Sequence, residues 1–301
     1  MHIVSNFCRV LVAVFILPIS AQALDSYEVN TKPLFKYPSL AKEFQRLHDK
    51  FQKVPLTIKE HEQRIDILET VLEKEGKWLD GYWLHGSESF ILASSYSSED
   101  DFPIARNILA NGLQKVETCL EIKGDHLLCR FFQGSLLAKI SSIDGIFASL
   151  RHGKTIHDAF FAVTRSSYNM QFRPNVSLIG AAYYGLGLFY RLVPDVFLVD
   201  WFWGIRGNLS KSIALHKKAI SYDDNNPCSL LMLSVALFCK YHSDNDHPEY
   251  KAAVKHLKTA QGITPIDKPQ EVCVKETYKI EKQTDRTCGY TQAKYQEEVK
   301  E

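Results

Sequence analysis

The 301-residue sequence lacks most of the patterns that mark an enzyme or a cofactor-binding domain. It contains no glycine-rich phosphate loop, no nucleophile elbow and no pair of cysteines at zinc-binding spacing. These absences argue against the nucleotide-binding, hydrolase and zinc-finger classes that such patterns define. We therefore predict a protein that is not an enzyme and that has no catalytic residue, no cofactor and no metal ion.

An excess of one charge is also missing. Lysine and arginine number 36 and aspartate and glutamate 35, so no global basic field attracts nucleic acid or an anionic membrane. We expect no nucleic-acid partner, and any membrane contact should be peripheral.

Long hydrophobic runs are absent except near the amino terminus. Arg9 precedes an unbroken apolar run, Val10–Leu17, and the small-x-small pattern Ala21-Gln22-Ala23 follows it. The run is far shorter than the roughly 20 residues that span a bilayer. We interpret residues 1–23 as a cleaved signal peptide, with an uncleaved membrane anchor as the alternative. Leu24 stands where a lipoprotein would have cysteine, so we expect a periplasmic or secreted protein without a lipid.

An even number of cysteines remains after that segment: Cys119, Cys129, Cys228, Cys239, Cys273 and Cys288. Exported chains commonly pair such cysteines in disulfides. Cys119 and Cys129 flank a predicted turn and could face each other across two helices. Cys228 and Cys239 cannot pair with each other, because one helix would hold them roughly 16 Å apart. The simplest interpretation of those two is as small buried hydrophobic residues.

Apolar spacing is helical almost throughout, and strand signals are nearly absent before the carboxyl-terminal tail. One apolar stripe after Pro38 recurs every three or four residues, at Leu40, Phe44, Leu47 and Phe51. Thr57 and Glu60 then form a capping-box pattern that begins a second helix. We assign residues 24–76 to an N-terminal helical cap.

Internal repetition is the most informative feature. Four residues match the first helix of a tetratricopeptide unit at every spacing, with tyrosine in place of tryptophan: Tyr183, Leu186, Gly187 and Tyr190. Four others match a second helix: Ala253, Leu257, Ala260 and Pro265. The glycine of the first helix is expected where the two helices of a pair approach closely.

Weaker copies of this glycine position occur at Gly86, Gly134 and Ala236. The intervals from Gly86 through Gly134 and Gly187 to Ala236 are 48, 53 and 49 residues. This period exceeds the usual 34, and we place the excess between the two helices of each pair. A bundle of unrelated amphipathic helices is the alternative. We favour an all-α fold, a tetratricopeptide-like stack of antiparallel helix pairs (α-solenoid), over residues 77–267.

Over residues 60–265, and most clearly from Ala181 to Pro227, the chain resembles exported tetratricopeptide-like proteins of the bacterial cell envelope. It is most similar to the T component of tripartite ATP-independent periplasmic (TRAP) transporters. That resemblance implies a helical transport subunit that associates with a periplasmic solute-binding protein. Members of the family are typically lipid-anchored, whereas this chain has Leu24 at the anchor position.

The segment from Arg191 to Gly207 replaces the short turn of an ordinary unit and is rich in aromatic residues. Our candidate residues for binding a ligand or partner lie in it and in the preceding helix: Tyr183, Tyr190, Arg191, Phe197, Trp201, Trp203 and Arg206. The simplest interpretation is a plug that buries its aromatic side chains on the helix stack. Alternatively the segment is the lip of an apolar groove whose two arginines bind an anionic ligand. Contact with a membrane surface is the third interpretation.

Few residues suggest acid–base chemistry. His85 and Glu88 are three apart on a predicted helix, and we interpret them as a polar pair on the surface. His152 and His157 are five apart and do not share a helix face. An exported helical enzyme that uses His85, Glu88 or His157 is the alternative function.

Residues 268–301 combine many charges with few large apolar side chains, which predicts an extended or partly disordered tail. Val272, Val274, Tyr278 and Ile280 hint at a short strand, and a disulfide from Cys273 or Cys288 would stabilise this segment most. For the whole chain we predict an exported scaffold that binds a protein partner or a hydrophobic anionic ligand. The sequence is also compatible with a homo-oligomer.

Overall fold

The computed structural model describes residues 25–293 of the chain. The predicted signal peptide and the predicted mature start at Leu24 lie outside this range. Within the range, no helix combines the length and the apolar character needed to cross a membrane.

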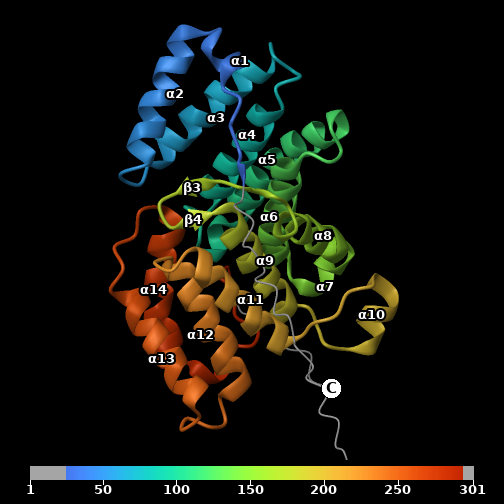
Figure 1. The fold of residues 1–301 in the computed structure, drawn as a ribbon, viewed down its shortest axis with the longest axis vertical. Coiled ribbons are helices and arrows are strands. Elements are labelled where there is room, and N and C mark those ends of the chain that lie inside the picture. The colour runs from blue at the N-terminus through green and yellow to red at the C-terminus, as the bar shows by residue number, and fades with distance from the viewer. Residues whose placement is uncertain (1–24, 294–301) are drawn as a thin grey trace, which may run out of the picture.

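Nearly all regular structure is helical, and the long helices stack from one end of the molecule to the other (Figure 1). The N-terminal helices are α1 Lys32–Phe35, α2 Pro38–Phe51 and α3 Ile58–Leu72. The helix pairs that follow are α4 Leu79–Ala93 with α5 Phe102–Ile122, α6 Leu127–Asp144 with α8 Gly153–Thr164, α9 Leu178–Leu192 with α11 Leu209–Tyr222, and α12 Pro227–Tyr241 with α13 Pro248–Gln261. Helix α14, Lys268–Lys282, follows the last pair.

The predicted all-α stack of antiparallel helix pairs is confirmed. A Cβ atom added to Gly134 on α6 would lie 2.7 Å from the Cβ of Ala159 on α8. One added to Gly187 on α9 would lie 2.6 Å from the ring of His216 on α11. Real Cβ atoms do not approach so closely, and interiors packed to crystal density cannot absorb the extra atom without strain. The repeated glycines therefore mark the places where the helices of a pair touch.

Extra length lies between the two helices in the second and third pairs, as predicted, whereas α12 and α13 are joined by a short turn. Residues 165–177, which contain the hairpin, lengthen the second repeat further after its pair. In the second pair the extra length forms the short helix α7, Ile146–Ser149, and the 3-10 turn η2, Leu150–His152. In the third pair it forms α10, Phe197–Trp203. Two other 3-10 turns precede α5 and follow α14: η1 Glu99–Asp101 and η3 Thr284–Arg286.

The N-terminal cap is attached through a buried carboxylate on α4. Asp80 accepts hydrogen bonds from the Tyr27 hydroxyl, the Asn30 backbone N–H and the Trp83 indole, each at 2.6 Å. The capping box that begins α3 is present, since Glu60 N–H donates to Thr57 Oγ1 and the Glu60 carboxylate accepts from Thr57 N–H. These contacts order the chain before the first pair.

Short strands occur where we expected almost none. Strands β3 Gln171–Arg173 and β4 Val176–Ser177 form an antiparallel hairpin, and β1 Asp25–Ser26 pairs in parallel with β2 Tyr168–Asn169. The β3–β4 turn places Asn175 at φ 62°, a left-handed conformation that asparagine tolerates. In Figure 1 this hairpin lies between the N-terminal helices and the α12–α14 group.

The prediction of an extended tail with a short strand is wrong for residues 268–282, which form helix α14. Cys273 and Ile280 are fully buried there. Two disulfides, Cys228–Cys273 and Cys239–Cys288, join this C-terminal segment to α12. The charges mislead because they occupy the outer face of the helix while a narrow apolar stripe faces α12 and α13.

One of the two predictions about the cysteines is confirmed, and the other is wrong. The Cys119–Cys129 disulfide, across the turn between α5 and α6, is confirmed. The interpretation of Cys228 and Cys239 as unpaired buried residues is wrong, because each forms a disulfide with the C-terminal segment. Their helix, α12, has buried residues on every side from Ser229 to Phe238, as expected for a helix enclosed by α9, α11, α13 and α14.

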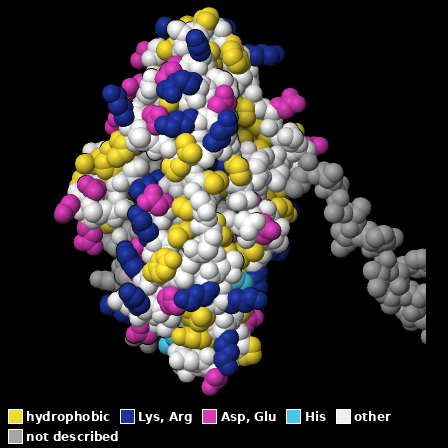
Figure 2. Space-filling model, turned by 90° about the vertical axis from the view of Figure 1, so that its left-hand side faces the viewer, with side chains coloured by type: hydrophobic (Ala, Val, Ile, Leu, Met, Phe, Trp, Pro, Cys, Tyr) yellow, Lys and Arg dark blue, Asp and Glu magenta, His cyan; other side chains and the backbone are white. Residues whose placement is uncertain are grey.

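The outer surface agrees with the balanced composition. On the face shown in Figure 2, basic and acidic side chains alternate, and neither sign forms a continuous patch.

Candidate ligand-binding cavity

A cavity of about 740 Å³ lies inside the stack. Its wall contains residues of the N-terminal helices, of α4, α6, α8, α9 and α12, of the β3–β4 hairpin and of the start of α14. Cavities of roughly 300–1,000 Å³ are typical of small-molecule sites. The helix pairs and the N-terminal cap thus line a partly open space large enough for a ligand.

Aromatic rings form the apolar part of the wall. Phe172 of β3 lies within 5.6–6.4 Å, between ring centres, of Trp83, Phe131 and Phe132. Trp83 and Phe132 stack in parallel at 5.8 Å, and Phe160 meets Phe131 at 5.8 Å. The β-hairpin therefore completes an aromatic wall that α4, α6 and α8 begin.

Two buried ion pairs form a polar part of the wall. Arg64 Nη1 lies 2.9 Å from Glu88 Oε1, and His61 Nδ1 lies 3.0 Å from Glu88 Oε2. Burial acts to raise the pKa of Glu88, but the charge of Arg64 and the bond with His61 outweigh it and leave that pKa below its usual value. Glu88 is therefore an ionised counter-ion of Arg64.

The second ion pair joins the β-hairpin to α14. Arg173 Nη1 lies 3.2 Å from Asp267 Oδ2, and Arg173 Nη2 donates to the carbonyls of Phe51 and Ile266. Its guanidinium carbon lies 3.7 Å from the centre of the Phe51 ring. Burial raises the pKa of Asp267, against the attraction of Arg173. Arg173 thus connects three distant parts of the chain at the cavity wall.

Several polar atoms of the wall have no hydrogen-bonding partner among the described residues. They are Arg64 Nε, Arg173 Nε, Gln270 Nε2 and Ser141 Oγ, and all four are buried. Lys139 also lines the cavity, and burial lowers its pKa to about 8. Each of these groups can donate a hydrogen bond, so the wall is matched to a ligand that carries acceptors.

The predicted role of Arg191 needs correction, whereas that of Arg206 stays a prediction. Arg191 is buried and donates to the carbonyls of Thr287, Cys288 and Tyr290, so it holds the C-terminal segment and does not face a ligand. Arg206 is exposed and pairs with Asp195. Neither side chain lines the cavity.

The two candidate tyrosines lie on α9, outside the cavity wall. Tyr183 stacks on Tyr222 at 5.8 Å between ring centres. The Tyr190 hydroxyl lies 2.9 Å from His157 Nε2 and accepts from Lys211. The structure does not bring either tyrosine together with the aromatic residues of α10.

The plug interpretation of the 191–207 segment is wrong for most of its aromatic side chains. Phe197, Trp201 and Phe202 are 64%, 72% and 68% exposed, and Trp203 is 39% exposed. Only the base of the segment reaches the cavity, where Val193 and Ile205 line the wall. The aromatic residues of α10 instead point away from the stack.

The surface interpretation of His85 and Glu88 is also wrong. Both are buried, and they contact different partners: His85 Nε2 lies 3.1 Å from Glu69, whereas Glu88 joins Arg64 and His61. His157 lies near Tyr190 and Asp158, away from them. These three residues therefore do not form one acid–base site.

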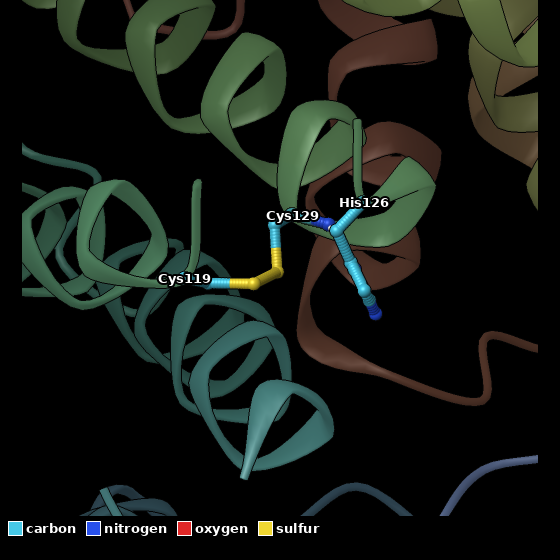
Figure 3. A group of neighbouring side chains, drawn as sticks. All are labelled: Cys119, His126 and Cys129. Carbon is cyan, nitrogen blue, oxygen red and sulfur yellow. A yellow bond between two sulfur atoms is a disulfide. The ribbon is translucent and has the colours of Figure 1, made fainter. Parts of the chain in front are cut away.

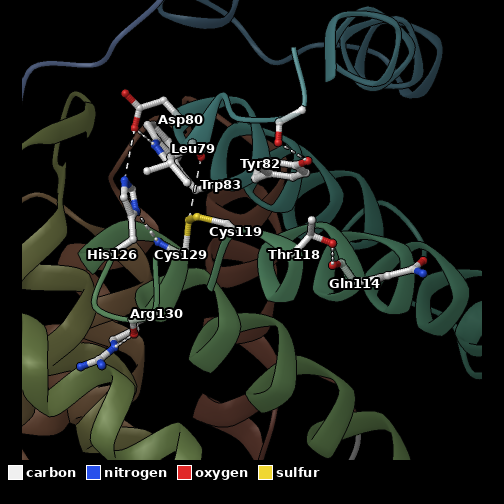
Figure 4. The surroundings of a disulfide bond; sticks show 12 residues. Leu79, Asp80, Tyr82, Trp83, Gln114, Thr118, Cys119, His126, Cys129 and Arg130 are labelled. Carbon is white, nitrogen blue, oxygen red and sulfur yellow. Dashed lines mark hydrogen bonds and ion pairs between the residues drawn. A yellow bond between two sulfur atoms is a disulfide. The ribbon is translucent and has the colours of Figure 1, made fainter. Parts of the chain in front are cut away.

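Among the described residues, one group of histidine, cysteine or acidic side chains is close enough together to hold a metal ion. It consists of Cys119, His126 and Cys129, whose ligand atoms lie within 4.8 Å of one another. Figure 3 shows the two sulfur atoms joined, with His126 beside them. His126 Nδ1 accepts the Cys129 backbone N–H, and Cys129 Sγ lies 3.9 Å from the Leu79 carbonyl (Figure 4). The group supplies no thiolate in this state, and it serves as a helix cap and a link between α5 and α6.

Sequence reasoning missed the cavity because its wall combines residues from distant segments. The apolar stripe that contains Phe44 predicts a helix core, and no motif includes Arg64. Phe172 and Arg173 lie in a hairpin for which the sequence gives no periodic signal. The one available signal was that Arg64 stands in line with the apolar positions Leu68 and Leu72 of its helix, because an arginine on a buried face is almost always paired.

No protein-family model matches the chain, and a search of the curated proteins finds no match. The cavity and the surface of this structure are therefore the basis on which a function can be proposed.

Proposed function

We propose that this protein is an exported binding protein that encloses a hydrophobic ligand with an acceptor-bearing, anionic head in its central cavity. The main observation in support of this proposal is that the cavity wall combines aromatic side chains with buried hydrogen-bond donors that lack partners among the described residues. Apolar surface favours the ligand body, and unpaired buried donors are costly unless a ligand satisfies them.

Export is supported by two independent features. Three disulfides occur within the described residues, and disulfides persist mainly in oxidising compartments. The signal-peptide pattern of residues 1–23 points the same way. A periplasmic transport role beside a solute-binding protein, as in the TRAP T component, remains our proposal for the biological setting and is supported by the repeat pattern alone.

Binding can be tested with a dansyl-labelled undecanoic acid, whose fluorescence rises in an apolar site. We expect saturable binding to the purified protein. Ala138→Trp should weaken it about tenfold or more, because residue 138 lines the cavity and the larger side chain fills it. Ala214→Trp is the matched control, since residue 214 is exposed on α11 and lies outside the wall. Equal binding by the two variants would contradict the proposal.

The anionic head can be tested at Lys139. Lys139→Met should weaken the carboxylate probe roughly tenfold, the order expected for one charged hydrogen bond, and should leave the methyl ester of the probe unaffected. Because the pKa of Lys139 is about 8, raising the pH from about 7 to about 9 should weaken binding of the carboxylate to the unmodified protein. The same loss for acid and ester would show that Lys139 only shapes the cavity.

A further inference from the structure

Helix α10 carries an exposed apolar face that the cavity does not explain. It stands away from the stacked helices on two connecting segments (Figure 1). At about 100° per residue, Phe197, Leu198, Trp201 and Phe202 share one face. All four are at least 64% exposed. Val199 lies on the opposite face and is buried. The helix therefore packs on the molecule through the face of Val199, and its large side chains point outward.

The charged residues of the α10 segment do not form a strong patch of one sign. Arg206 pairs with Asp195 at the base of the segment. On α8, which begins at Gly153 beside Ile205, Lys154 pairs with Asp158 at 2.7 Å. Asp200 lies off the apolar face, on the other side of the helix. An acidic or basic partner therefore finds no complementary patch there, and the occupant of this face should be apolar without a required charge.

The size of the face decides between a protein and a lipid partner. A stable interface with a second copy or another protein takes about 20–30 residues from each side and buries about 800 Å² per partner. The outward face of α10 offers four side chains on a convex helix. A bilayer has no such minimum, and tryptophan and phenylalanine are suited to its interfacial region.

We infer that α10 inserts its outward face, Phe197, Leu198, Trp201 and Phe202, into the interfacial layer of a lipid bilayer. The connecting segments of α10 include Val193 and Ile205, which line the cavity. Docking through α10 therefore brings one end of the cavity close to the membrane, where apolar ligands dissolve. The insertion itself requires nothing of the cavity.

The test is binding to vesicles of phosphatidylcholine alone, measured by co-sedimentation and by quenching of tryptophan with brominated lipid. Trp78 and Trp83 are 3% and 2% exposed, so quenching reports the two tryptophans of α10. We expect binding that persists in high salt, because insertion and not charge attraction drives it. Vesicles that also contain anionic lipid should give a similar affinity. Binding only to the anionic vesicles, or none to either, would overturn the inference.

The variant that combines Phe197→Ser, Trp201→Ser and Phe202→Ser should lower the vesicle affinity about tenfold or more. Ile104→Ser, Ile122→Ser and Tyr278→Ser together form the matched control, since these exposed apolar residues lie on α5 and α14. Trp201→Phe should keep the affinity. Equal losses in the two triple variants would overturn the inference, as would a lipid-free dimer that only the α10 variant dissociates.

The cavity-filling Ala138→Trp variant separates this inference from the proposed function. It should bind vesicles normally while it loses the fatty-acid probe. Loss of both activities together in a folded Ala138→Trp protein would contradict independent docking by α10.

Discussion

Helix α10 and the C-terminal segment that contains α14 reverse the usual relation between composition and burial. The first is a run of large apolar residues that lies exposed, and the second is rich in charge yet packs against the repeats. α10 has only Val199 buried, whereas α14 buries Cys273, Thr277 and Ile280. Composition alone therefore misplaces both segments.

This difference indicates that the C-terminal segment contributes mainly to the stability of the molecule and that α10 contributes mainly to binding. The C-terminal segment is held by two disulfides and by the three carbonyl contacts of Arg191. Arg191 lies at the end of α9, directly before the segment that contains α10. Its guanidinium therefore connects the start of that exposed segment to the packed C-terminal segment. We expect changes in the C-terminal segment to alter unfolding and changes on α10 to alter binding.

The largest effect is expected when the C-terminal segment loses one of its two disulfides. Replacing Cys239 and Cys288 together by serine opens a loop with a sequence separation of 49, while Cys228–Cys273 still joins α14 to α12. The loss should be about 3.5 kcal/mol of unfolding free energy. The same change at Cys119 and Cys129, with a separation of 10, should cost about 3 kcal/mol. Urea unfolding measures both. A smaller loss at Cys239 and Cys288 would show that the Cys228–Cys273 disulfide and side-chain packing hold the C-terminal segment without this second disulfide.

Arg191→Ala should come next, at about 3 kcal/mol, because it leaves buried carbonyls of the C-terminal segment without a donor. Arg206→Ala is the control and should change stability by less than about 1 kcal/mol, as is usual for an exposed ion pair. Thermal and urea unfolding of the two variants compare them directly. Similar values would remove the distinction between the packed and the exposed arginine.

Acid should weaken the packed region through His216. Burial lowers the pKa of this histidine to about 3, whereas an unfolded histidine has a pKa of about 6.5. Between these values the unfolded chain binds a proton that the folded chain does not, so stability falls as the pH falls below about 6.5. At pH near 5 the loss from this group is about 2 kcal/mol relative to pH 7.5.

The measurement is urea unfolding at both pH values for the unmodified protein, His216→Leu and His242→Gln. The leucine variant should lose this part of the pH dependence whatever its absolute stability. The exposed His242 is the control and should keep it. An unchanged slope in His216→Leu would assign the acid sensitivity to other groups.

The smallest effect on stability is expected on α10 itself. Leu198→Ala should shift the unfolding free energy by no more than about 0.5 kcal/mol, because the side chain is exposed. Val199→Ala, one residue on, should cost about 1 kcal/mol or more, since Val199 is the buried contact of this helix. Thermal melts of the pair test whether α10 presents one free face. A large loss at Leu198 would show that this face is packed after all.

Much of the helical architecture could be predicted from local pattern. The glycines at 134 and 187 marked two of the helix contacts because close approach depends on a single missing Cβ. Thr57 and Glu60 marked a helix start because a capping box involves only four neighbouring residues. The apolar stripe of α14 was too sparse to compete with its charges, and the β3–β4 hairpin was too short to give a periodic signal.

The sequence by itself determined the period of the repeats and the helical class, and it made the Cys119–Cys129 pairing possible, because each depends on residues close together in the chain. Only the tertiary structure decided that Arg64, Arg173 and Lys139 share one cavity with Phe172, and that α10 faces outward while α14 packs inward. Those outcomes depend on which distant surfaces meet. A side chain is buried when another element covers it, and no local pattern specifies that element.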